Sequence, residues 1–143
     1  MHFEGLSLVN GRAFGGTASP AEGGCVLVGQ NASLTLLNVR IRNCQAQGRG
    51  GAIFVGSGST LVVNNTIISE NSAGLDGGGI YLYRSRMESD NSSISINSAL
   101  KNGGGIYLNA SILSAIASLI HTNVANSGNC LFVCKFITTL WCE

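Results

Sequence analysis

Gly50-Gly51-Ala52-Ile53-Phe54-Val55 is one copy of a hexapeptide that recurs along this chain. Related copies begin at Gly23, Gly77 and Gly103, and a diverged copy begins at Gly128. The starting positions 23, 50, 77, 103 and 128 are therefore 27, 27, 26 and 25 residues apart. A nearly constant period of this length is the signature of a solenoid, in which each copy forms one structural unit.

Further columns of similar residues repeat between the hexapeptides. The apolar columns are Leu34, Leu61, Met87 and Leu113; Leu36, Val63, Ser89 and Ala115; and Ile41, Ile68, Ile94 and Ile120. Side chains alternate with the two-residue period of a β-strand, and no stretch has a helical period. We therefore predict an all-β fold, a right-handed parallel β-helix of about five coils, with 25–27 residues and two or three short strands in each coil.

This fold predicts which side chains face inward. One inward column is Val26, Ile53, Ile80, Ile106 and Leu131, and a second is Val28, Val55, Leu82, Leu108 and Val133. The paired glycines are expected at corners, where positive φ or close backbone approach is needed. Two asparagine columns are expected to form structural ladders at turns, with side chains bonded to the backbone of the next coil. They are Asn38, Asn65 and Asn91, and Asn71, Asn97 and Asn123.

Composition narrows the class of protein. The 143 residues suit a single domain, 1–143, with residues 135–143 as a cap or a non-repeat tail; we expect it to be a piece of a longer protein. Charged residues make up 10 % of the chain, against about 25 % in ordinary domains. The net charge of +1 argues against nucleic acid as a partner. The chain shows no apolar run long enough for a transmembrane helix, and its first residues lack the pattern of a signal peptide.

The five cysteines do not predict a metal site. Cys25, Cys44, Cys130, Cys134 and Cys142 contain no C-x-x-C pair, and the two histidines, His2 and His121, are far apart. We expect the cysteines to be small apolar residues that fill the core. The sequence predicts neither a cofactor nor a metal ion.

The repeats resemble those of the polymorphic outer membrane protein family, which alternate G-G-A-[ILV] with F-x-x-N. The matching motifs are the hexapeptides from Gly50, Gly77 and Gly103, and Ile-x-x-Asn at residues 68–71, 94–97 and 120–123. Isoleucine replaces the phenylalanine of that second motif. The resemblance implies a β-helical module of the pectin-lyase-like class, displayed on a cell surface or secreted for adhesion, with glycans or proteins of host or neighbouring cells as partners.

One cluster of charged residues could carry chemistry. Glu88 and Asp90 alternate on one strand, close to Arg84 and Arg86. Such carboxylates could act as an acid–base pair or bind calcium weakly, but no third acid completes a site. A solvated strand face is the simpler explanation, so we predict no catalytic residue and keep these four as binding candidates.

A column of aromatic residues is a second candidate. Leu27, Phe54, Tyr81, Tyr107 and Phe132 lie between the two inward columns and should point outward. Their rings could bind sugars or another protein. Alternatively, they stack only to stabilise their own sheet, or are covered by a loop. We therefore expect a non-catalytic structural and interaction module of an adhesin-like protein. The alternative is a carbohydrate-active enzyme, a polysaccharide lyase or hydrolase, or a carbohydrate-binding β-helix.

Overall fold

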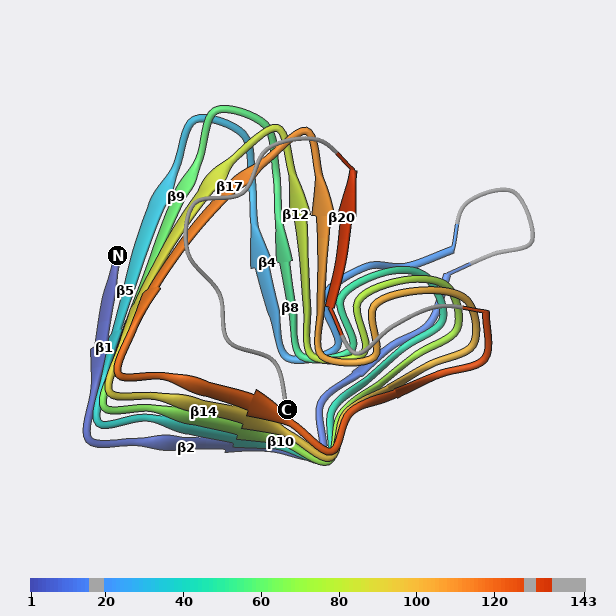
Figure 1. Ribbon diagram of the computed structural model, residues 1–143, viewed down its shortest axis with the longest axis horizontal. Coiled ribbons are helices and arrows are strands. Elements are labelled where there is room, and N and C mark those ends of the chain that lie inside the picture. Colours follow the sequence, from blue (N-terminus) through green and yellow to red (C-terminus); the bar gives the residue numbers. More distant parts are fainter. Residues whose placement is uncertain (16–19, 128–130, 135–143) are drawn as a thin grey trace.

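The protein is a right-handed parallel β-solenoid, described here from a computed structural model (Figure 1). The structure describes residues 1–15 and 20–127, and the backbone of the strand at 131–134. These residues form twenty strands and no helix. Each coil contributes one strand to each of four parallel, five-stranded sheets, which we call sheets A to D. The predicted parallel β-helix is confirmed.

The four sheets follow one another around each coil. Sheet A contains β1 (His2–Glu4), β5 (Ser33–Leu37), β9 (Thr60–Asn64), β13 (Arg86–Asp90) and β17 (Ile112–Ile116). Sheet B contains β2 (Ser7–Val9), β6 (Arg40–Arg42), β10 (Ile67–Ser69), β14 (Ser93–Ser95) and β18 (Leu119–His121). Sheet C contains β3 (Arg12–Ala13), β7 (Gln45–Ala46), β11 (Ser72–Ala73), β15 (Ser98–Ala99) and β19 (Val124–Ala125). Sheet D contains β4 (Val26–Val28), β8 (Ile53–Val55), β12 (Ile80–Tyr83), β16 (Ile106–Asn109) and β20 (Leu131–Cys134).

The expectation of two or three strands per coil is wrong, because each coil has four. The additional strand belongs to sheet C and is only two residues long, with a single inward alanine. Two residues are too few to show an alternating pattern in the sequence. After β7, β11 and β15 the chain bulges outward in a lobe before it enters sheet D, on the right of Figure 1.

The core is a stack of aliphatic side chains in register. Ile53, Ile80 and Ile106 pair across β8, β12 and β16, and all three are fully buried. The predicted columns through Val55, Leu61 and Ile68 are buried in the same way. Each such side chain stabilises the fold by roughly 1.5–3 kcal/mol when it leaves water. The side chains of Leu131 and Val133 lie outside the described residues.

The paired glycines have two different roles. Gly50 and Gly77 have φ of 69° and 71°, a left-handed conformation that side chains disfavour. At the second glycine the obstacle is the next coil: a Cβ on Gly51 would lie 2.1 Å from the carbonyl oxygen of Gly78. This pair therefore allows a sharp bend and close stacking of backbones in consecutive residues.

Residues in the left-handed conformation also mark the other corners of the coil. The corner between sheets A and B has Asn38, Asn65, Asn91 and Ala117; that between B and C has Asn43, Glu70, Ile96 and Thr122; that between D and A has Asn31, Gly58, Arg84 and Ala110. Asparagine tolerates this conformation better than most residues, which explains its frequency at these turns.

At most of these corners, the residue after the left-handed residue has an N–H that donates to a side chain of the next coil. Ser85 departs from this pattern, because its buried hydroxyl has no hydrogen-bond partner among the described residues. Between sheets B and C the acceptors are asparagines. The N–H of Cys44 donates to Oδ1 of Asn71 (2.9 Å), that of Asn71 to Oδ1 of Asn97 (3.0 Å), and that of Asn97 to Oδ1 of Asn123 (2.9 Å). The Nδ2 groups donate back to the preceding coil, as from Asn97 to the carbonyl oxygen of Ile68 (3.0 Å). Each amide thus bridges two coils where the bend interrupts the sheets.

Hydroxyl groups do the same at two other corners. Between sheets A and B, the N–H of Val39 donates to Oγ1 of Thr66 (3.2 Å) and that of Thr66 to Oγ of Ser92 (3.1 Å). Between sheets D and A, Ser59 and Ser111 accept the N–H groups of Ala32 and Ser85. Three corners are therefore closed by one arrangement with different side chains.

The first described copy departs from this pattern through a disulfide. Cys44 takes the position of Asn71, Asn97 and Asn123, and it is bonded to Cys25. Cys44 is fully buried and Cys25 packs against the core, but the expectation that both are simple apolar residues is wrong. The bond links the corner between sheets B and C to the start of sheet D, within 19 residues of sequence. Cys130, Cys134 and Cys142 lie outside the residues whose side chains are described.

Replacing Asn97 by alanine should lower the free energy of unfolding by about 2–3 kcal/mol, because buried partners on Asn71 and Ile68 lose their hydrogen bonds. Asn126→Ala is the matched control, since Asn126 is exposed. Urea denaturation followed by circular dichroism measures both variants. Equal, small effects would show that the amide ladder contributes little to stability.

Candidate functional site

The aromatic column lies on the outer side of sheet D and forms a stack. The ring centroids of Phe54 and Tyr81 are 5.4 Å apart, those of Tyr81 and Tyr107 are 5.0 Å apart, and the rings are nearly parallel. Parallel pairing of β8, β12 and β16 sets this spacing. The expected outward direction holds, and Tyr81 is nevertheless only 3 % exposed. Phe54 and Tyr107 are half-buried, and the side chain of Phe132 lies outside the described residues.

The lobe beside sheet D explains why Tyr81 is buried. Arg49, from the lobe between β7 and β8, places its guanidinium carbon 5.4 Å from the centroid of the Tyr81 ring. The Tyr81 hydroxyl accepts a hydrogen bond from Nδ2 of Asn109 (3.0 Å). Burial raises the pKa of Tyr81 above its ordinary value of 10.0, although Asn109 and Arg49 oppose that shift. The ring therefore belongs to the packing between sheet and lobe.

Residues before the paired glycines form a polar column in the same lobe. Nη1 of Arg49 lies 3.0 Å from Oε1 of Glu22 in the preceding coil, and Nε lies 3.9 Å from Oδ2 of Asp76 in the next. Asn102 follows, and its Nδ2 donates to Oδ1 of Asp76 (2.9 Å). The order acid, base, acid and amide places opposite charges on successive coils, which favours this register over a shifted one.

The charged cluster on sheet A is only partly assembled. Glu88 is held by Arg86, whose Nε and Nη2 both lie 2.9 Å from Oε1 of Glu88. Arg84 does not join them: it sits at the corner before β13, with its guanidinium 5.2 Å from the ring of Tyr83. Asp90 lines a hollow of about 220 Å³ together with Glu88, between Asn64 and Ile116 of the flanking strands. In the described part of the chain, no three His, Cys, Asp or Glu side chains gather as metal ligands would.

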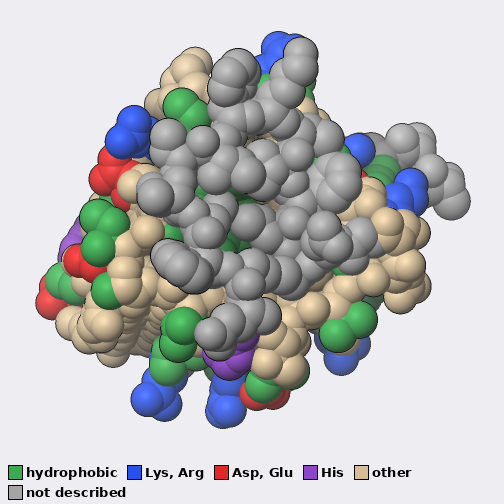
Figure 2. Space-filling model, viewed as in Figure 1, with side chains coloured by type: hydrophobic (Ala, Val, Ile, Leu, Met, Phe, Trp, Pro, Cys, Tyr) green, Lys and Arg blue, Asp and Glu red, His purple; other side chains and the backbone are tan. Residues whose placement is uncertain are grey.

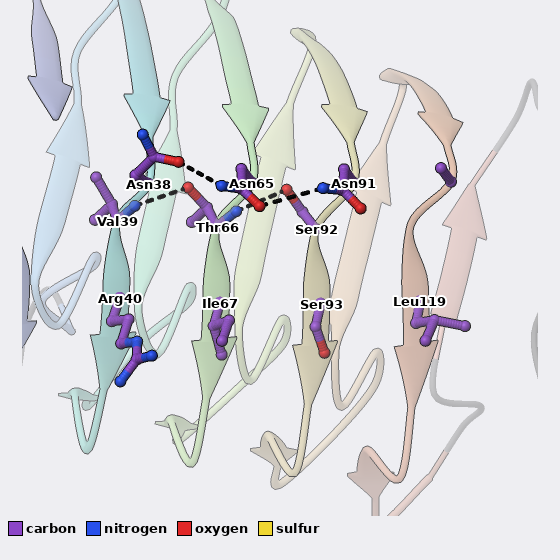
Figure 3. A pocket seen from close by; sticks show the side chains of 11 residues that line it. Asn38, Val39, Arg40, Asn65, Thr66, Ile67, Asn91, Ser92, Ser93 and Leu119 are labelled. Carbon is purple, nitrogen blue, oxygen red and sulfur yellow. Dashed lines mark hydrogen bonds between the residues drawn. The ribbon is translucent and has the colours of Figure 1, made fainter. Parts of the chain in front are cut away.

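Another hollow follows the outside of the corner between sheets A and B (Figure 3). It has a volume of about 440 Å³ and crosses the coils rather than following one strand. One side carries the exposed amides of Asn38, Asn65 and Asn91, linked by hydrogen bonds from Nδ2 of Asn65 to Oδ1 of Asn38 and from Nδ2 of Asn91 to Oδ1 of Asn65 (3.2 Å). The other side carries the first outward residues of sheet B, which are Arg40, Ile67, Ser93 and Leu119. We call this hollow the corner groove.

Sequence reasoning found part of the corner groove. It predicted that the outer asparagine column bonds the backbone of the next coil, whereas these side chains bond one another. It did not consider Arg40. A usable signal is present, because Asn65-Thr66 and Asn91-Ser92 are Asn-hydroxyl pairs one coil apart. Such a pair places a left-handed residue and a hydroxyl acceptor together, which defines the corner at which the groove lies.

On the face seen in Figure 2, Lys and Arg side chains lie at separate places around the rim. Within residues 1–15 and 20–127, no helix is long and apolar enough to cross a membrane.

Replacing Tyr81 by phenylalanine should make stability less sensitive to alkaline pH. The pKa of Tyr81 is raised on folding, so its contribution is full below about pH 10 and is lost as pH rises through the folded-state pKa. Thermal unfolding across this range measures the effect, and Tyr83→Phe, at a half-buried phenol, is the control. The assignment fails when Tyr81→Phe and the wild type lose stability in parallel.

Comparison with known proteins finds one similarity, to a repeat family. The model of the Chlamydia polymorphic membrane protein repeat matches residues 65–83. The match runs from the corner groove through Asn71 to the paired glycines and the aromatic stack of sheet D. No curated protein and no solved structure matches the chain. The match covers one of the repeats, and together with the parallel solenoid around it supports a β-helix similar to those built from polymorphic membrane protein repeats.

Proposed function

We propose that the chain is a non-catalytic interaction module of an adhesin-like protein, at the cell surface or secreted. The observation that carries this proposal is the polymorphic membrane protein repeat at residues 65–83, within a solenoid whose sheets all have an outer face. The repeat family suggests a structural surface protein and is not a known family of enzymes.

The disulfide supports the same location. A bond between Cys25 and Cys44 persists in oxidising compartments, such as the periplasm or the cell exterior, and is rare in the cytosol. It lies in the first described copy, where the sulfur of Cys44 replaces an asparagine amide.

The polar groups of the interior favour a scaffold over a catalyst. Asn71, Asn97, Thr66 and Ser92 are buried and are hydrogen-bonded between coils. The carbohydrate-active alternative would use Glu88 and Asp90 as its acids. However, the Glu88 carboxylate is already paired with Arg86, through Nε and Nη2 of the guanidinium. We therefore assign partner binding to the outer side chains and assign no catalytic residue.

Adhesion tests the proposal directly. Beads coated with the purified chain should attach to host or neighbouring cells several-fold more often than albumin-coated beads. Soluble folded chain should compete for attachment, whereas chain that has been reduced, alkylated and unfolded should not. Attachment no higher than that of albumin beads would contradict the adhesive role.

Catalysis is tested in parallel by following unsaturated or reducing-end products from polyuronates. We expect no turnover. Sustained turnover that is lost in both Glu88→Gln and Asp90→Asn would establish the enzyme alternative and overturn the non-catalytic assignment.

A further inference from the structure

We propose that the corner groove binds an acidic glycan, with Arg40 holding a carboxylate and the outer asparagine amides holding ring hydroxyls. This inference rests on the proposed function, because it names the ligand class of an adhesive surface. It concerns the outer amides of Asn38, Asn65 and Asn91, which the scaffold uses only in part.

The amides retain hydrogen-bonding capacity. A primary amide has two donor hydrogens and two acceptor lone pairs. Asn65 uses one hydrogen towards Asn38 and one lone pair towards Asn91, and its side chain is exposed. One donor and one acceptor position therefore remain at Asn65 for a ligand hydroxyl, which can both donate and accept.

The spacing of the row suits a linear polymer of sugar rings. Strands of neighbouring coils lie about 4.8 Å apart, so the amides repeat at that interval along the solenoid axis. This interval is comparable with the length of one pyranose ring. The row is also held in place, because Thr66 and Ser92, which follow Asn65 and Asn91, are buried and bonded to the backbone. A fixed row lowers the entropy lost on binding.

Arg40 provides the charge. Its side chain is exposed, and none of the ion pairs or side-chain hydrogen bonds in the described residues engages its guanidinium. Such a group binds carboxylates in a bidentate manner, which adds strength and orientation. Arg42 and Glu70 line the adjoining hollow on sheet B, which Arg40 also borders, so Arg40 is the charged residue of the corner groove.

Apolar surface completes the site. Ile67 is 40 % exposed and Leu119 is 61 % exposed, and both continue the row that begins at Arg40. In Figure 3 these side chains follow one another across successive strands, below the asparagines. The C–H faces of sugar rings can pack on them while the ring hydroxyls reach the amides.

Two other partner classes fit this surface less well. A peptide that adds a strand needs an open sheet edge, but β6, β10 and β14 are paired on both sides. Nucleic acid needs several cations to neutralise its phosphates, and Arg40 is the only cation among the described residues that line the corner groove. A chain of neutral rings with occasional carboxylates matches one cation among amides.

Binding of a defined polyuronate oligosaccharide tests the assignment by calorimetry. We expect wild-type protein to bind it, with affinity that falls as salt rises. Arg40→Gln should weaken binding roughly tenfold, in line with the loss of a charge-assisted pair. Arg12→Gln, at an exposed cation on sheet C, should bind like the wild type. Thermal unfolding of each variant establishes that it is folded.

The methyl ester of the same oligosaccharide separates charge from shape. The ester should bind about as weakly as the acid binds to Arg40→Gln. Equal binding of acid and ester, unchanged binding by Arg40→Gln, or no binding of the acid would each overturn the proposal. Asn65→Ala should lower the affinity for the acid and for its ester alike, because the amide contacts are independent of charge. An unchanged affinity of this variant would show that the amides do not contact the ligand.

The bead assay distinguishes this proposal from the adhesive function itself. Beads coated with wild-type protein and with Arg40→Gln could attach equally well, without competition from the oligosaccharide. That result would support adhesion and overturn the glycan assignment. Attachment that is abolished by protease treatment of the target cells, but not by periodate, would identify a protein partner and have the same consequence. The expected result is competition by the acidic oligosaccharide and loss of attachment after periodate.

Discussion

The structure depends on how each coil turns its corners without leaving backbone N–H groups unpaired. Parallel strands in register supply hydrogen bonds along the flat sheets, but a left-handed residue at each bend turns the next N–H away from the carbonyl of its neighbour. At three corners a side-chain oxygen of the following coil accepts that N–H. The acceptors are Asn71, Asn97 and Asn123 between sheets B and C, Thr66 and Ser92 between sheets A and B, and Ser59 and Ser111 between sheets D and A. A buried N–H without a partner costs about 1–3 kcal/mol, so a solenoid of many corners requires such acceptors.

This requirement separates the residues of the scaffold from those open to a partner. The inner amides and hydroxyls form hydrogen bonds with the backbone, and the inward aliphatic side chains pack against one another. The charges of the lobe, from Glu22 through Arg49 to Asp76, are likewise occupied with neighbouring coils. What remains for recognition is the outer row at each corner and the outer faces of the sheets. The corner groove combines a row of amides with two exposed aliphatic side chains and the guanidinium of Arg40.

Much of the fold was predictable because it repeats. A single hexapeptide such as that at residues 50–55 would be weak evidence, but its recurrence in phase with the Ile41 and Leu34 columns specifies the register of neighbouring coils. The same property explains the correct prediction that Ile53, Ile80 and Ile106 form one buried column. Sheet C was missed because its strands are only two residues long.

The candidate site was less predictable because it depends on contacts that do not repeat. Tyr81 is buried by Arg49. The residues at the position of Arg49 in the neighbouring coils are the acids Glu22 and Asp76, so the repeat pattern does not predict this contact. The disulfide was missed because Cys25 and Cys44 belong to different columns, which the bend of the coil brings together. Arg40 lies in a column whose other members are Ser7, Ile67, Ser93 and Leu119. Because this position has no common residue type, the repeats do not predict a function for Arg40.

Amide hydrogen exchange measured by nuclear magnetic resonance tests the central claim most directly. The account predicts that the N–H groups of Val39, Thr66 and Asn71 exchange as slowly as those inside the sheets, although they sit at bends. In Thr66→Ala, exchange at Val39 should accelerate while exchange at Asn71 stays slow, because only the acceptor of the first N–H is removed. Rapid exchange at these corners in the wild type, or no change at Val39 in the variant, would contradict the claim that side chains of one coil close the corners of another.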